Sequence, residues 1–417
     1  MSVWSIIKYK VLKQKACVGV FLSHFSAIYC FSFHFYYKIV LEIYFGGTTM
    51  LNLDLINEFR GMVNANSFTF FSYRKKLNKN QWNCICSAMD WIEVSIEYLI
   101  KHPFSKRYDL NSIEIYAFIS SVDILVEAIQ QLHRVIFSSN NPPYQYDNDC
   151  FPDNPFNQTD LTFFKTVRAC FGAHSVNLSE PGEKNKTDKK RFASWSGCHF
   201  GEKSFSVILY SNQIKGEDIF LSIDHNQILA FAEKHYNYLN VLMDELKRQH
   251  NVFCEEMRKI PFVCGTDPLS RLEILKRENE ARMDNAYYRD LIDYLTLIFS
   301  TPVSCKENFD LIEKYHAALI KVIEKIEINL QKMTIEDFDF DDILYPTTKN
   351  LPDGWHYYVE KLSDYVFGNG YSPDIWLDQL KKIFNGLFEF KFNNYKELYV
   401  LIEAAIYSLS LDEKNDS

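Results

Sequence analysis

Two long stretches with apolar residues spaced three and four apart most restrict how this chain can fold. Residues 81–102 carry such a stripe, which Pro103 ends, and residues 112–137 repeat the pattern after a short polar loop. This spacing places the apolar side chains on one face of an α-helix. We therefore expect a hairpin of two long amphipathic helices and a mainly α fold.

The hairpin lies in a predicted first domain, residues 50–262. Residues 138–158 are rich in Asn and Pro, which predicts an irregular, exposed segment. A third helix is expected over residues 159–172. Residues 205–210 and 218–223 are short β-prone runs separated by a Lys-Gly turn, so we expect one small β-hairpin.

The last third, residues 263–417, is predicted to form a second helical unit. Asp267 and Pro268 stand in the order expected for a helix N-cap and first position. Residues 276–284 are nearly all charged, which indicates a solvated segment. Residues 307–333 carry a coiled-coil-like apolar seam of only about four heptads, so packing within a bundle is favoured over dimerisation through it.

The first 49 residues differ from the rest. Residues 16–37 contain no Asp, Glu, Lys or Arg and are long enough to cross a bilayer. The codons of Gly46 and Gly47 can contain a ribosome-binding sequence just before Met50, which favours a second interpretation. In that interpretation residues 1–49 are a mis-annotated upstream leader and the protein is cytoplasmic. The alternative is membrane anchoring through residues 16–37.

Composition and motifs exclude several function classes. The net charge of −9 argues against a protein that coats nucleic acid through its overall field, although a local basic site remains possible in principle. The ten Cys residues include no C-x-x-C pair, and the chain has no P-loop, G-x-G-x-x-G or H-E-x-x-H motif. The acidic run at residues 336–342 lacks the Gly and Glu of a calcium loop. We therefore expect no metal and no cofactor.

One group of residues stands out as a candidate catalytic pair, Arg168 and His174. On a continuous helix they would point about 120° apart, but Gly172 favours a helix end that would let His174 curl back. An imidazole can move protons while a guanidinium holds phosphate. Glu127 and His133 on the preceding helix are further possible neighbours, with surface residues as the default interpretation.

A basic loop follows this pair. It contains five cationic residues against Glu183 and Asp188, and we expect these five to bind RNA: Lys184, Lys186, Lys189, Lys190 and Arg191. A cationic loop beside a phosphate-handling pair suits a nucleic-acid substrate. A solvated, mobile loop is the alternative.

The R-x5-H spacing at the end of a helix, after a helical hairpin, resembles the R-x(4–6)-H signature of the HEPN superfamily. The segments 209–212 and 355–362 are also similar to proteins of low-GC Gram-positive bacteria. The resemblance implies a HEPN-like helical bundle and a metal-independent ribonuclease of a phage-defence, toxin or stress system. It further implies that Arg168 binds phosphate, that His174 transfers protons, and that a homodimer completes the site.

Two functions follow from this interpretation. The first is an endoribonuclease that cuts RNA phosphodiesters with Arg168 and His174. The second is a non-catalytic HEPN-like scaffold that binds a partner protein or a nucleotide. Catalytic members of the superfamily often carry a polar residue after the Arg, whereas this chain has Ala169, a difference that counts against activity more than against the fold. With this difference weighed, the first function is favoured.

Overall fold

The computed structural model describes residues 51–65, 67–102, 108–173, 177–179, 189–195, 204–335 and 338–415. The predictions for residues 1–49, including the apolar segment 16–37, lie outside these ranges. The described chain is mainly helical with a small, curled antiparallel sheet, and it forms two compact units, residues 51–251 and 252–415. Within the described ranges, no helix combines the length and apolar character needed to cross a membrane.

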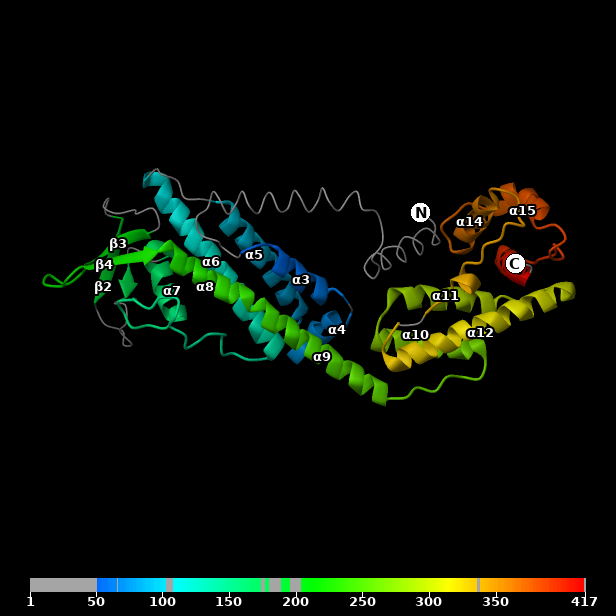
Figure 1. Cartoon of the computed structure of the whole chain (residues 1–417), viewed down its shortest axis with the longest axis horizontal. Helices are drawn as coiled ribbons and strands as arrows, with labels where there is room; N and C mark the ends of the chain where they lie inside the picture. The colour runs from blue at the N-terminus through cyan, green and yellow to red at the C-terminus, as the bar shows by residue number, and fades with distance from the viewer. Residues whose placement is uncertain are drawn as a thin grey trace. The chain divides into compact units, whose positions relative to one another are not determined.

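The predicted helical hairpin is confirmed. It consists of α5 (Trp82–Lys101) and α6 (Tyr108–Phe137), which lie side by side in Figure 1. Their apolar stripes are buried against each other and against two shorter helices, α3 (Asp54–Val63) and α4 (Phe68–Arg74). The periodic apolar pattern is sufficient to predict the α5–α6 hairpin, because the apolar face of each helix is buried by packing against the other.

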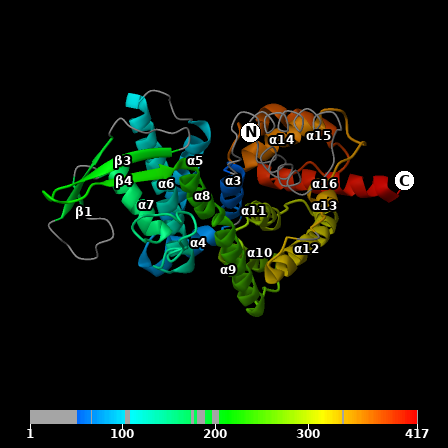
Figure 2. The same ribbon diagram turned by 60° about the vertical axis from the view of Figure 1, so that its left-hand side comes forward.

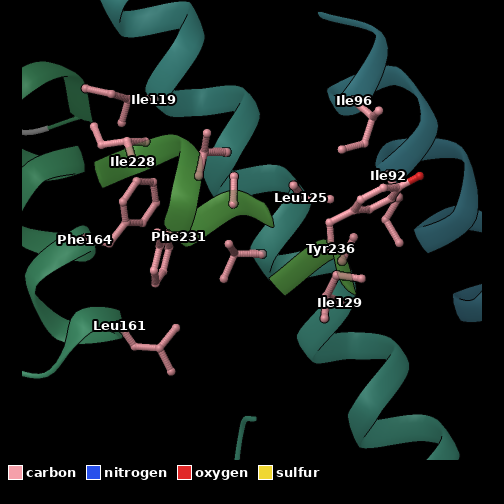
Figure 3. Close-up of a cluster of buried hydrophobic side chains, with 14 of the residues drawn as sticks. Ile92, Ile96, Ile119, Leu125, Ile129, Leu161, Phe164, Ile228, Phe231 and Tyr236 are labelled. Atoms are coloured by element: carbon pink, nitrogen blue, oxygen red, sulfur yellow. The ribbon is translucent and has the colours of Figure 1, made fainter. Parts of the chain in front are cut away.

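Helical segments further along the chain, including the first part of α9 (Leu239–Lys259), complete the core of the 51–251 unit. α7 (Asp160–Arg168) continues into a π turn (Ala169–Ala173), and α8 (His225–Asn237) packs along α6. Figure 3 shows where these helices meet: Phe164 of α7 and Phe231 of α8 point toward each other, with ring centroids 4.8 Å apart. The core is therefore built from segments distant in the sequence.

The sheet is larger than the single hairpin that the sequence predicts. Its strands pair antiparallel in the order β1 (Leu178–Ser179), β2 (Lys190–Ser194), β3 (Ser204–Ser211) and β4 (Ile219–Asp224). The expected β3–β4 hairpin is confirmed, but β1 and β2 were not predicted. Both are short, and β2 begins with two cations, so neither carries the alternating apolar pattern that marks a strand.

The segment 138–158 is irregular, as predicted, but it is held firmly rather than loosely exposed. Phe151 is 1% exposed and packs against Phe163 and Phe231, with ring centroids 5.1 and 5.5 Å apart. Lys234 of α8 forms an ion pair with Asp147 at 2.5 Å. The partners of these contacts lie on α7 and α8, so the composition of residues 138–158 alone does not predict them.

The 252–415 unit is a second helical bundle. Its helices are α10 (Pro268–Arg282), α11 (Ala286–Ser300), α12 (Phe309–Lys332), α13 (Asp341–Leu344), α14 (Trp355–Val366), α15 (Leu377–Ile383) and α16 (Tyr395–Asn415). Asp267 caps α10 as expected, accepting a hydrogen bond from the Ser270 amide at 3.0 Å. The seam of α12 is buried in the bundle, where α16 packs against α12 and α14 (Figure 2).

The charged stretch 276–284 is solvated only in part. Lys276, Arg277 and Glu280 are exposed, whereas the Arg282 side chain is 2% exposed. Its guanidinium donates to the carbonyls of Met257 and Ile260 at 2.7 and 2.6 Å. These bonds hold the chain before residue 263 to the second bundle. The two compact units divide inside α9 (Leu239–Lys259), between residues 251 and 252, and the predicted domain boundary between residues 262 and 263 stays a prediction.

Candidate functional site

Arg168 is the last residue of α7, and α6 supplies its partner. The Nε atom of Arg168 lies 3.1 Å from Oδ2 of Asp123, and the two side chains are 49% and 25% exposed. A guanidinium has five N–H donors, so a contact with one carboxylate leaves donors that can bind a second anion. The ion pair thus fixes Arg168 on the α6–α7 surface while much of the side chain stays in contact with solvent.

Asp123 is the less exposed partner of the pair. Burial raises the pKa of its carboxyl above the ordinary value, Arg168 opposes this shift, and the negative charge of Glu127 one turn along α6 adds to it. Lys165 lowers the pKa from the α7 side. Asp123 therefore lies between two cations of α7 and one anion of α6, in a position to orient Arg168.

Gly172 lies near the end of the described helical segment, which runs through the π turn to Ala173. Its role in ending the helix stays a prediction, because residues 174–176 lie outside the described ranges. A Cβ atom at Gly172 would lie 2.2 Å from Cδ2 of Tyr116, which shows that this glycine admits the Tyr116 ring of α6. His174 lies outside the described residues, so its approach to Arg168 stays a prediction. π turns are frequent at functional sites.

The sheet packs on this π turn. The ring of Phe171 lies 5.0 Å from that of Phe205 on β3 and 5.3 Å from that of Trp195, centroid to centroid. Because Phe171 follows Arg168 by less than one π turn, the sheet supports the segment that leads from Arg168 toward His174.

The five predicted RNA-binding residues differ in exposure, and two of them lie outside the described ranges. Lys184 and Lys186 lie outside the described residues. Lys189 is exposed just before β2, and Lys190 is partly buried at its first position. Arg191 is 8% exposed, and its Nη1 atom donates to the carbonyls of Leu209 and Glu217. Arg191 is therefore engaged by the curled sheet, and its burial disfavours the phosphate contact expected of it.

The suggested neighbours of the pair are also placed. Glu127 is exposed, accepts a hydrogen bond from Gln131 at 2.7 Å, and acts on Asp123 through its charge. His133 Nδ1 hydrogen-bonds with the Tyr238 hydroxyl at 2.9 Å, and burial lowers the pKa of His133. His133 thus has a structural partner, and Glu127 belongs to the surroundings of Asp123.

A group of possible metal ligands lies elsewhere in this unit, at Asp149, Cys150 and Asp160, whose ligand atoms are within 4.8 Å of one another. The oxygens of Asp160 accept hydrogen bonds from three backbone amides, and Asp149 pairs with Lys234 at 2.6 Å. Burial raises the pKa of Cys150 to about 12, which disfavours the thiolate that a metal would need. This arrangement favours an anchored turn over a metal centre.

Asp123 is the site residue that the sequence analysis missed. It places a charge in the otherwise apolar run Val122–Val126 of α6, in which Val122 and Leu125 are buried. A carboxylate in an apolar run of a helix indicates a cationic partner on a neighbouring helix, and this feature of the sequence could have identified Asp123. Helix-face geometry alone pointed to Glu127, one turn further on.

No family model, no curated protein and no solved structure matches this chain in the three comparisons with known proteins. The resemblance to the HEPN superfamily therefore stays a prediction based on the residues that carry it.

Proposed function

We propose that the 51–251 unit belongs to an endoribonuclease that cuts RNA phosphodiesters without a metal ion, with Arg168 and His174 at its site. The observation that carries this proposal is the half-exposed Arg168, held by Asp123 at the surface where α7 passes through a π turn toward His174. A fixed guanidinium can hold a phosphate and stabilise the charge that develops on it. The imidazole of His174 would move the proton.

A non-catalytic scaffold is the second candidate, and the same contact favours it. The Arg168–Asp123 ion pair joins α7 to α6, a structural role that needs no substrate. Ala169, which follows Arg168, adds no polar group beside it. A scaffold of this kind would bind a partner protein or a nucleotide.

Cleavage of RNA by the purified full chain in EDTA is the experiment that separates the two functions. We expect Arg168→Ala and His174→Ala each to lower the cleavage rate by about 10²–10⁴-fold, because each removes charge stabilisation or proton transfer. The double variant should be little worse than either single one, since the two groups act as a unit. The rate should follow an imidazole ionisation near neutral pH.

Matched controls exist on the same unit. Arg248 is a surface arginine paired with Glu245, and His102 is an exposed histidine at the end of α5. Arg248→Ala and His102→Ala should leave cleavage unchanged. A folded wild-type chain that leaves RNA intact would favour the scaffold, and metal-dependent cleavage that survives both Arg168→Ala and His174→Ala would contradict the proposed pair.

A further inference from the structure

A cationic segment lies at one end of the 51–251 unit, and nothing in the proposed ribonuclease site uses it. Residues 61–89 contain no Asp or Glu but four cations, in a chain whose net charge is −9. Arg74, Lys75 and Lys79 are exposed around the turn that joins α4 to α5. The charge of this stretch of sequence is therefore opposite to that of the protein as a whole, although Glu245 of α9 acts on Lys76 from outside it.

The fourth cation, Lys76, fixes this turn in place. Its Nζ atom donates to the carbonyls of Val135 and Ile136 at 2.8 and 3.3 Å, at the C-terminal end of α6. Tyr73 is bound to Gln249 of α9 by a hydrogen bond of 2.7 Å. Lysines near a helix C-terminus satisfy its last carbonyls and its dipole. The exposed cations are thus presented from a turn held by two long helices.

The turn also exposes apolar side chains. Leu77 is 75% exposed and has a positive φ of 54°, a conformation that is uncommon for a residue with a Cβ atom. Phe71 of α4 is 50% exposed. We call the group Phe71, Arg74, Lys75, Leu77 and Lys79 the basic tip. It combines cations with aliphatic and aromatic surface, which water solvates poorly.

We propose that the basic tip binds the surface of membranes that contain anionic lipids, with the cations on the headgroups and Leu77 inserted between them. Each Lys or Arg near such a surface strengthens the binding of a cationic segment about fivefold, and exposed apolar side chains add to this by entering the interface. RNA is a less suitable occupant, because the basic tip offers a single ring, Phe71, for base stacking, and Leu77 offers none.

Sedimentation of the full chain with vesicles tests this proposal. We expect the chain to bind phosphatidylserine–phosphatidylcholine vesicles, and this binding to weaken with added salt. Binding should be stronger than to pure phosphatidylcholine vesicles, and the difference should depend on the basic tip. Lys75→Glu with Lys79→Glu should lower the partition coefficient on anionic vesicles by roughly tenfold or more. Leu77→Ser should lower it by several-fold at every salt concentration, since it removes apolar contact rather than charge.

The matched control is Lys381→Glu with Lys382→Glu, which changes the net charge equally at two exposed adjacent lysines of α15. It should leave vesicle binding unchanged, and an equal loss in this variant would overturn the proposal in favour of net charge alone. Binding through residues 16–37 would not depend on lipid charge or on the tip. Failure of the wild-type chain to bind anionic vesicles, or tip-dependent binding of RNA but not of vesicles, would also overturn it. Loss of RNA cleavage in Arg168→Ala does not bear on any of these outcomes.

Discussion

Replacing Glu403 with glutamine should stabilise the 252–415 unit at alkaline pH and flatten the pH dependence of its unfolding. Glu403 lies on α16, is 2% exposed, and has a pKa that burial raises to about 8, against a smaller lowering by its hydrogen bond with Tyr399. Nearby, the hydroxyls of Tyr294 and Tyr315 are 2.8 Å apart. The carboxyl is therefore mostly protonated in the folded bundle at neutral pH.

The sign of the effect follows from comparing the folded and unfolded chains. The unfolded carboxyl loses its proton near the ordinary pKa of 4.5, while the folded one keeps it up to about pH 8. The stabilisation is complete below pH 4.5 and is lost as the pH rises from 4.5 to 8. At 1.36 kcal/mol per pKa unit the loss is at most roughly 4–5 kcal/mol. Glutamine keeps the shape of the side chain and cannot ionise.

Hydrogen exchange of α16 amides at pH 5, 7 and 9, corrected for intrinsic rates, measures this unit by itself. The control is Glu397→Gln on the same helix, where the buried carboxylate accepts from the backbone and hydroxyl of Ser304 and from the Asn393 amide. Because glutamine replaces one acceptor oxygen by a donor, that variant should be less stable at all three pH values. Equal opening free energies of the wild-type α16 at pH 5 and pH 9 would contradict the role given to Glu403.

The fold was predictable from the sequence wherever the signal is local. The stripes of α5 and α6 and the Asp267 cap of α10 depend on residues within a turn or two of each other, and they were found. The burial of Arg282 and the pairing of β2 depend on groups far along the chain. A charged run is expected to be solvated, and only the structure shows that the carbonyls of Met257 and Ile260 accept hydrogen bonds from Arg282.

The candidate site shows the same limit. Arg168 was found through its spacing to His174 and its place at a helix end, which are local features. Asp123 was missed because the ion pair crosses from α6 to α7, and no local pattern showed that two carbonyls outside its own strand hold the guanidinium of Arg191. Spacing finds residue types suited to a reaction, while partners decide whether each side chain is available for it.

Replacing Asp160 with alanine should release the 147–151 turn and strongly destabilise the 51–251 unit. Asp160 is 2% exposed at the start of α7, and its two oxygens accept from the amides of Asp149, Cys150 and Phe151 at 3.0–3.1 Å. Each buried amide left without an acceptor costs about 1–3 kcal/mol. Since part of this turn is open to water, we expect a total loss of roughly 3–5 kcal/mol.

Two measurements check this expectation, the urea midpoint of the unit and the rate of proteolysis within residues 138–158. The wild-type turn should resist cleavage, because Lys234 and the buried Phe151 hold it together with Asp160, and Asp160→Ala should make it the first site cut. Asp153 is an exposed acid in the same segment, so Asp153→Ala should stay within about 0.5 kcal/mol of the wild type. An unchanged midpoint and cleavage pattern in Asp160→Ala would mean that burial of Phe151, rather than the three amide bonds, keeps this turn folded.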